Sequence, residues 1–453
     1  MGQKNDFAKG SISKHILNLA IPMTLAQIIN ILYNIVDRFY IGRIPNASTL
    51  AITGLGITLP IISTVMAFAN LFGMGGAPLC SIARGKGNIE EAENIMGNSF
   101  ALLSIFGILI SVLGLIFKKP LLFLFGSSSQ TFTYANDYIT IYLLGSIFVM
   151  ISLGMNSFIN CQGFGKIGMM TVLLGAITNI VLDPIFIFVF NLGVKGAALA
   201  TVISQFLSCF WVIRFLTSKD ALLSLKKKNF KIKWVYLKRI VLLGLSGFIM
   251  ALTNSVVQIV CNVTLQIYGG DLYIGIMTII NSVRQIIIMP VHGITSASQP
   301  VLGFNYGAKK YHRVISGIKF LSIVCICYTS IMWLVLRIFP EFFIKIFNND
   351  KELITKGVPC INLYFFGFFM MSLQIAGQAT YVALGKSKQA IFFSLLRKII
   401  IVVPLTILLP RYLNLGSTGV FLAEPISNFI GGLSCYITML ITVCKKLNIK
   451  QDS

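Results

Sequence analysis

Two acidic side chains lie inside long apolar stretches of this sequence. Asp37 stands near the end of the first stretch, and Asp183 stands within a later one, four residues after Asn179 and directly before Pro184. A carboxylate near the centre of a membrane-spanning helix costs roughly 2.5–3.5 kcal/mol on insertion scales. Two interpretations of Asp183 are open: it binds a proton or cation in a water-filled cavity, or it caps a helix that is broken at Pro184.

Oxygen-bearing side chains near these acids indicate which ion they would take. Asn179 and Asp183 are four residues apart and share a helix face, while Asn156 and Thr201 stand in the preceding and following stretches at comparable depth. Carboxylate, amide and hydroxyl oxygens suit a hard monovalent cation or a proton shared between acids, and argue against a transition metal. We therefore predict a cation or proton site made by Asp37, Asn156, Asn179, Asp183 and Thr201.

Polar stripes run along two of the apolar stretches. The first stretch carries, on the same face as Asp37, the residues Gln27, Asn30, Tyr33 and Asn34, and the seventh carries Asn254, Gln258, Asn262 and Gln266 but no acid. Because lipid cannot satisfy such groups, we interpret the stripes as lining a cleft or the protein interior. Two simpler roles stay open: the amides bond neighbouring helices, and Asp37 pairs with Arg38 or Arg43.

The second half of the chain has a different set of intramembrane charges. These are Arg284, Arg397, Lys398 and Glu424. Glu424 can pair with Arg284 or Arg397, either as a buried ion pair that holds the C-terminal helices together or as a participant in transport coupling.

The composition indicates a polytopic α-helical membrane protein. Of 453 residues, 56% are hydrophobic and only 11% are charged, and no polar segment is long enough for a separate soluble domain. The formal charge of +23 comes from basic residues in loops between apolar runs, which is the positive-inside pattern rather than a nucleic-acid surface. We expect both termini in the cytoplasm. The nine cysteines are scattered, and we infer no disulfides.

The apolar runs predict twelve membrane spans in two parallel six-helix bundles, an all-α fold. Their predicted limits are 15–40, 50–78, 94–117, 134–160, 168–190, 196–216, 239–267, 272–301, 314–339, 355–383, 390–410 and 417–443. We divide the chain into an N-terminal lobe (1–218), a basic cytoplasmic linker (219–238) and a C-terminal lobe (239–453).

An internal repeat supports the two bundles. Asn191-Leu192-Gly193 recurs as Asn414-Leu415-Gly416, and Pro184 recurs as Pro404, whereas Asp183 matches Val403 and Thr201 matches Glu424. Six spans per half make the repeats parallel, with a cleft between two similar bundles. The proline therefore belongs to the shared scaffold, and the acid is left for a site that only the first half carries.

Several short motifs resemble those of the multidrug and toxic compound extrusion (MATE) transporters. They are Asp37–Gly42, Ala83–Asn88, Gln162-Gly163, Asn179–Pro184, Gln299-Pro300 and Asn305–Ala308. The resemblance covers nearly the whole chain, and its motifs are specific when taken together. It implies an inner-membrane antiporter that exports small organic, often cationic, compounds against Na⁺ or H⁺ influx by alternating access.

The resemblance is to the branch of the family with acids in the N-terminal lobe. It implies an ion site with Asp37 on the first helix, Asn179 and Asp183 on the fifth, and the Thr201 hydroxyl on the sixth, joined by Asn156 from the fourth. We accordingly expect no cofactor besides the coupling ion, a monomer in the lipid bilayer, and no nucleic-acid partner.

Two other classes of membrane protein fit this sequence less well. A lipid-linked oligosaccharide flippase of the same superfamily would need several cations for a pyrophosphate, and only Arg284 and Arg397 are obvious candidates. An intramembrane enzyme would need clustered acids or histidines at an aqueous face and a polar loop or domain, and the sequence has neither. We predict a transporter and not an enzyme.

Overall fold

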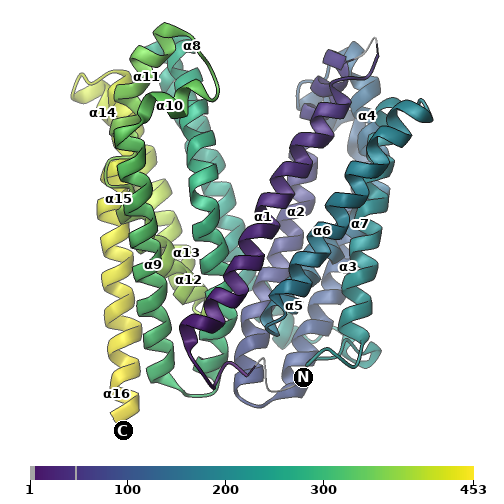
Figure 1. Cartoon of the computed structure of the whole chain (residues 1–453), viewed down its shortest axis with the longest axis vertical. Coiled ribbons are helices and arrows are strands. Elements are labelled where there is room, and N and C mark those ends of the chain that lie inside the picture. Colours follow the sequence, from purple (N-terminus) through teal and green to yellow (C-terminus); the bar gives the residue numbers. More distant parts are fainter. Residues whose placement is uncertain (1–5, 46–47, 453) are drawn as a thin grey trace. The chain divides into compact units, whose positions relative to one another are not determined.

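The computed structural model describes residues 6–45 and 48–452, and the ordered elements among them are helices (Figure 1). The chain forms two compact units: Asn18–Gly244 with the N-terminal residues through Phe7, and Leu245–Ser453 with Ala8–Leu17. The segment predicted as a linker thus falls in the first unit.

The first unit is built from α1 (Ile12–Ile41), whose first residues belong to the second unit, and the helices that follow it. These are α2 (Ser48–Gly85), α3 (Ile89–Leu124), α4 (Ser129–Leu144), α5 (Ser146–Cys161), α6 (Gly165–Pro184), the π-helix η1 (Ile185–Val189), α7 (Gly193–Thr217), the 3-10 helix η2 (Lys227–Phe230) and the beginning of α8 (Trp234–Gly307).

The second unit contains the rest of α8 and the later helices. They are α9 (Tyr311–Ile338), α10 (Pro340–Lys345), α11 (Lys351–Tyr364), α12 (Phe368–Ala383), α13 (Ser387–Leu395), the π-helix η3 (Leu396–Val402), α14 (Val403–Tyr412), α15 (Ser417–Met439), the π-helix η4 (Leu440–Lys445) and α16 (Lys446–Asp452).

The described residues hold the twelve predicted spans. Nine helices are long and apolar enough to cross a membrane, and two bent pairs add one span each, with a bend of 56° between α4 and α5 and of 47° between α11 and α12. Gly270, with φ 68° and ψ −166°, divides the 74-residue α8 into two spans. The sequence predicts unbroken helices at 134–160 and 355–383, and the structure bends both.

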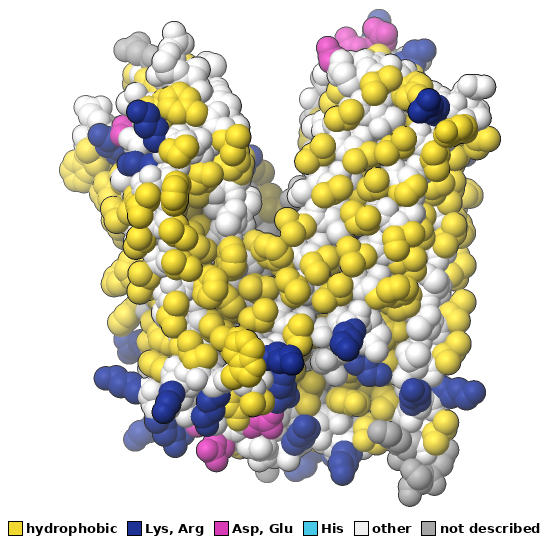
Figure 2. Space-filling view, turned by 180° about the vertical axis from the view of Figure 1, so that it is seen from behind, with side chains coloured by type: hydrophobic (Ala, Val, Ile, Leu, Met, Phe, Trp, Pro, Cys, Tyr) yellow, Lys and Arg dark blue, Asp and Glu magenta, His cyan; other side chains and the backbone are white. Residues whose placement is uncertain are grey.

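Exposed side chains on these helices are those of a protein in lipid. Large aliphatic residues are exposed on helices of both units. Ile116 in the first unit is 63% exposed, and Ile331 in the second is 59% exposed. Figure 2 shows hydrophobic side chains over most of the visible face of each unit, with Lys and Arg gathered toward its ends. Such apolar surface is compatible with lipid and not with water.

The repeat detected in the sequence is also a repeat of backbone conformation. Asn191 and Gly193 have φ of 53°, and their counterparts Asn414 and Gly416 have φ of 52° and 51°. Asn and Gly are the residues that tolerate this left-handed region best. A π-helix lies next to each of the matched prolines, η1 directly after Pro184 and η3 shortly before Pro404. Corresponding spans of the two halves therefore share their irregularities.

The capping interpretation of Asp183 is wrong. The helix does not break at Pro184 but continues through it into η1, and no side chain caps either element there. A π-helical turn accommodates the missing proline N–H without ending the span. The Asp183 carboxylate is thus left without the structural role that capping would have given it.

The segment 219–238 packs against α3 through polar contacts. Lys226 Nζ lies 2.8 Å from both carboxylate oxygens of Glu93. The Asn98 side chain donates to the carbonyl of Asn229 at 3.2 Å and accepts from the N–H of Lys233 at 2.8 Å. These contacts explain why the segment belongs to the first unit.

The start of α8 approaches α2 so closely that only glycine fits. A Cβ added at Gly244 would collide with the carbonyl of Leu71, and one added at Gly75 would collide with the carbonyl of Ile240. Gly247, one turn further along α8, would place its Cβ in open space. Two backbones in this proximity are typical of small residues at membrane helix contacts.

We therefore expect Gly244→Ala to lower the free energy of unfolding by about 1–3 kcal/mol, the usual cost of overpacking. Thermal unfolding of the purified protein in detergent measures the effect. Gly247→Ala is the matched control and should leave the melting temperature unchanged or slightly higher. Equal melting temperatures for the two variants would contradict the close approach.

Candidate functional site

The two acids of the first unit are buried together. The side chain of Asp183 on α6 is 0% exposed and that of Asp37 on α1 is 8% exposed. Their carboxyl groups lie within interaction range of each other. Among the described residues neither acid forms a salt bridge: Arg38 is exposed, and the Arg43 guanidinium lies 4.0 Å from the Phe39 ring centre. A direct Asp37–arginine salt bridge, one of the two simpler roles left open by the sequence, is thus not found among the described residues, although Arg38 acts on Asp37 electrostatically.

An amide and a hydroxyl complete this group. Asn179 Nδ2 donates to Asp183 Oδ1 at 3.3 Å and lies 3.5 Å from Thr201 Oγ1 on α7. The spacing of four residues on one helix places Asn179 and Asp183 on one face, as the sequence indicates. Four of the five residues predicted for the ion site thus come together, from α1, α6 and α7.

Asn156 is not brought to this group, which corrects the prediction of comparable depth. Its Nδ2 donates to the carbonyl of Gly168 at 3.1 Å. Gly168 precedes Asn179 by eleven residues, or about 16 Å along the helix axis at 1.5 Å per residue. Asn156 joins α5 to the beginning of α6 instead of reaching the acids.

Buried oxygens without partners define what the group can bind. Within the part of the chain that the structure describes, Asp37 Oδ1, Asn179 Oδ1 and Asp183 Oδ2 are buried and accept no hydrogen bond. Each such atom costs about 1–3 kcal/mol if nothing satisfies it. All three are acceptors, so only an electropositive ligand can serve them. The donor set fits a proton or a hard cation with oxygen ligands, and it has no sulfur or imidazole for a softer metal.

Tyr138 on α4 is a neighbour of this group that sequence reasoning missed. Tyr138 is 4% exposed and lies within interaction range of Thr201 and of Asp37. Tyr33, which the polar stripe includes, also lies within electrostatic range of Asp37 and Asp183. Tyr138 directly follows Asn136 and Asp137 in the sequence, and no spacing pattern distinguishes it from an ordinary core tyrosine.

The other residues of the first polar stripe are at least partly exposed and make no contact that fixes their role. Gln27 and Asn34 are exposed, and Asn30 and Tyr33 are partly buried. Asn34 Nδ2 donates at 2.6 Å to the carbonyl of Asn30 in its own helix. Hydrogen bonds of these amides to neighbouring helices are not found among the described residues, which leaves their polar groups available to solvent or ligand.

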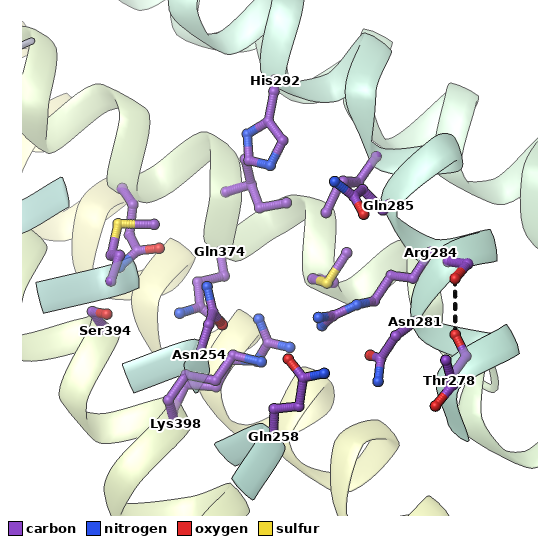
Figure 3. Close-up of a pocket in the computed structure, with 17 residues that line it drawn as sticks. Asn254, Gln258, Thr278, Asn281, Arg284, Gln285, His292, Gln374, Ser394 and Lys398 are labelled. Carbon is purple, nitrogen blue, oxygen red and sulfur yellow. Dashed lines mark hydrogen bonds between the residues drawn. The ribbon is translucent and has the colours of Figure 1, made fainter. Parts of the chain in front are cut away.

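A polar pocket of about 380 Å³ lies within the second unit (Figure 3). Its lining includes Asn254 and Gln258 of the predicted stripe, and the amides of Asn281, Gln374 and Gln378. Asn262, from the same stripe, is partly buried further along α8. A smaller pocket of about 60 Å³ shares Asn254, Gln258, Arg284 and Lys398 with the first and reaches Glu424.

The charges of the second half converge on a single acid. Glu424 on α15, 5% exposed, forms a salt bridge with Arg397. Its Oε1 also lies 3.2 Å from Lys398 Nζ and 3.6 Å from Arg284 Nη1. The sequence predicts Arg284 or Arg397 as the partner of Glu424, and the structure brings both arginines to it. The sequence shows Lys398 only as an intramembrane charge, and it is a further partner of Glu424, although adjacent residues of a regular helix point in different directions. Here the π-helix η3 carries Arg397 and Lys398, and both side chains reach the acid.

Comparison with known proteins identifies the family. The MatE family model matches residues 22–185 and 247–408, which is most of the chain and falls once in each half. The chain belongs to the MatE family. This membership makes it a multi-pass membrane transporter of the MATE type.

Relatives of this MatE-family transporter match along nearly their whole length. The Multidrug export protein MepA of Staphylococcus haemolyticus is 25% identical over 436 residues, covering 95% of this chain and 94% of that protein. The protein of the same name from Staphylococcus aureus (strain MSSA476) is 23% identical over 444 residues, covering 96% and 95%. A crystal structure of MATE in the bent conformation superposes with a TM-score of 0.92 at 21% identity, covering 98% of each chain, which establishes the shared fold.

We expect Glu424→Gln to destabilise this MatE-family protein strongly, because it leaves three cations without their acid. Breaking a buried ion pair by removing one partner costs about 3–5 kcal/mol of unfolding free energy. Thermal unfolding in detergent measures the loss. The control is Glu341→Gln, the same substitution in an exposed pair with Lys345, which should barely change the melting temperature. A wild-type melting temperature for Glu424→Gln would contradict the assignment of a buried cluster.

Proposed function

We propose that this protein is a multidrug exporter that drives small organic compounds, often cationic, out of the cell against the influx of Na⁺ or H⁺. One observation carries the proposal: the first unit holds two buried acids on different helices, and each has one carboxylate oxygen that accepts no hydrogen bond from the described residues. Such acids are expensive in a membrane unless an ion or proton uses them. The relatives that are named multidrug export proteins support the substrate class.

The proposed mechanism couples the charge of this acid pair to the position of α1. A proton or cation that enters from outside binds at Asp37 and Asp183 and neutralises them, which removes the cost of excluding water from their surroundings. Pro22 lies inside α1 and interrupts its hydrogen bonding, so it is the natural bending point of the helix that carries Asp37. The ion shifts the equilibrium between conformations only because it binds one of them better. Closure around the neutral pair then expels the drug.

The setting of this exchange is the cytoplasmic membrane. The excess of Lys and Arg in alternate loops supports cytoplasmic termini by the positive-inside rule. Each polypeptide carries its own complete acid pair within one unit, so we propose that the monomer is the transporting species.

Asp37→Asn and Asp183→Asn should each abolish ion-driven export of a cationic dye from reconstituted vesicles, under a Na⁺ gradient or a pH gradient, whichever drives the wild type. The asparagine amide has nearly the size of the aspartate carboxylate, but it carries no negative charge that could bind a cation or a proton. Asp220→Asn is the matched control, since Asp220 is exposed in the segment that follows α7, and it should export at the wild-type rate. Wild-type export by both acid variants at equal protein levels would refute the proposal.

Thr201→Val should raise the ion concentration needed for half-maximal export about three- to tenfold, because it removes one neutral oxygen ligand. The maximal rate at saturating ion should change less. Thr217→Val on the same helix, where the hydroxyl bonds only to its own helix, is the control and should leave the ion dependence unchanged. An unchanged ion dependence in Thr201→Val would remove Thr201 from the ligand set.

A further inference from the structure

We propose that the polar pocket of the second unit binds the oxyanion group, a carboxylate or phosphate, of an amphipathic organic substrate. This inference rests on the proposed function and extends it, since it adds organic anions and zwitterions to the compounds that the protein would carry. Every residue that lines the pocket belongs to the second unit.

The charge of the pocket favours an anion. Arg284, Arg397 and Lys398 line it, and the acid that these cations share is Glu424. The residues that line the two pockets include no second Asp or Glu. Arginine stays protonated in proteins, so the two arginines alone outnumber the acid, and a protonated lysine adds to the excess. Excess positive charge at membrane depth calls for an anionic partner.

Arg284 is the cation with the weakest contact to Glu424, and it is therefore the one we assign to the anion. Arg397 is committed to Glu424 and to the Ser427 hydroxyl at 3.4 Å. Arg284 reaches Glu424 only at 3.6 Å and donates no hydrogen bond to any residue that the structure describes. Its side chain is 26% exposed at the pocket. A guanidinium offers five N–H donors in the planar arrangement that matches the two oxygens of a carboxylate or phosphate.

The surroundings of Arg284 suit an organic ligand rather than a bare inorganic ion. Figure 3 shows the charged ends of Arg284 and Lys398 pointing into the same space, with the amides of Asn254, Gln258 and Asn281 around it. The pocket also has apolar walls, including Ile288 and Met371. Its volume of about 380 Å³ falls within the usual range for small-molecule sites.

Binding of two dyes with the same aromatic core tests the inference. The purified full-length protein in neutral detergent is titrated with carboxyfluorescein, an anion, and with rhodamine 6G, a cation, and fluorescence polarisation reports binding. We expect Arg284→Gln to weaken carboxyfluorescein binding about tenfold or more, as the loss of a charge-assisted hydrogen bond predicts. Arg284→Lys should restore part of the affinity. Rhodamine 6G binding should not fall in Arg284→Gln.

Two further variants protect the test from misfolding. Gln258→Glu keeps the size of the side chain, replaces an amide of the pocket lining with a negative charge, and should abolish carboxyfluorescein binding. Arg411→Gln removes an exposed arginine of α14 outside the pocket lining and should bind like the wild type. Melting temperatures measured in parallel identify any variant that fails to fold. If either Arg284→Gln or Gln258→Glu does not fold, the folded one of the two tests the inference.

The outcomes separate this inference from the proposed function. Competition by octanoate or by octyl phosphate supports the oxyanion site, and the stronger competitor indicates an organic acid or a lipid-like phosphate as the natural ligand. No carboxyfluorescein binding by the wild type, or equal binding by folded Arg284→Gln and Gln258→Glu, overturns the inference. Rhodamine 6G export by wild-type vesicles in that same case would leave the proposed function intact.

Discussion

The cost of placing charge within the membrane is the constraint on which this structure depends. Apolar side chains cover each unit, so every buried charge must find its partner inside the same unit or in a ligand. The first unit buries two carboxylates without a salt bridge among the described residues, and the second buries more cations than acids. The acid pair of the first unit thus carries excess negative charge, and the Glu424 cluster of the second carries excess positive charge.

These opposite sites occur on a repeated scaffold. The left-handed Asn-Leu-Gly turns, the bent fourth and tenth spans and the π-helices beside Pro184 and Pro404 occur in both halves. The side chains at matched positions differ: Asp183 becomes Val403, and Thr201 becomes Glu424. The position of Thr201, beside the acid pair of the first unit, thus matches the position of the central acid of the second. The backbone irregularities belong to the fold, and the exchanged side chains give each unit its own chemistry.

Much of this arrangement could be predicted from the sequence because it depends on local periodicity. The apolar runs predict the twelve spans, and the spacing of Asn179 and Asp183 places both on one helix face. The bends at Gly145 and Gly367 could not be predicted, since the chain contains many other glycines in straight helices. The sequence wrongly predicts Asn156 in the ion site. The depth of a residue in the membrane depends on how the helices tilt and pack, and the spacing of residues along one helix does not reveal this. The convergence of Lys398 and Arg397 on Glu424 likewise depends on the π-helix η3, for which the sequence has no clear signal.

The central claim is that the acid pair of the first unit is where the driving ion binds. Its most direct test is equilibrium binding of the ion to purified protein in the absence of drug, with radioactive Na⁺ in one arm and proton uptake followed by a pH-sensitive dye in the other. The account predicts saturable binding of about one ion per wild-type polypeptide and none by the double variant Asp37→Asn/Asp183→Asn. Undiminished ion binding by the folded double variant would contradict it.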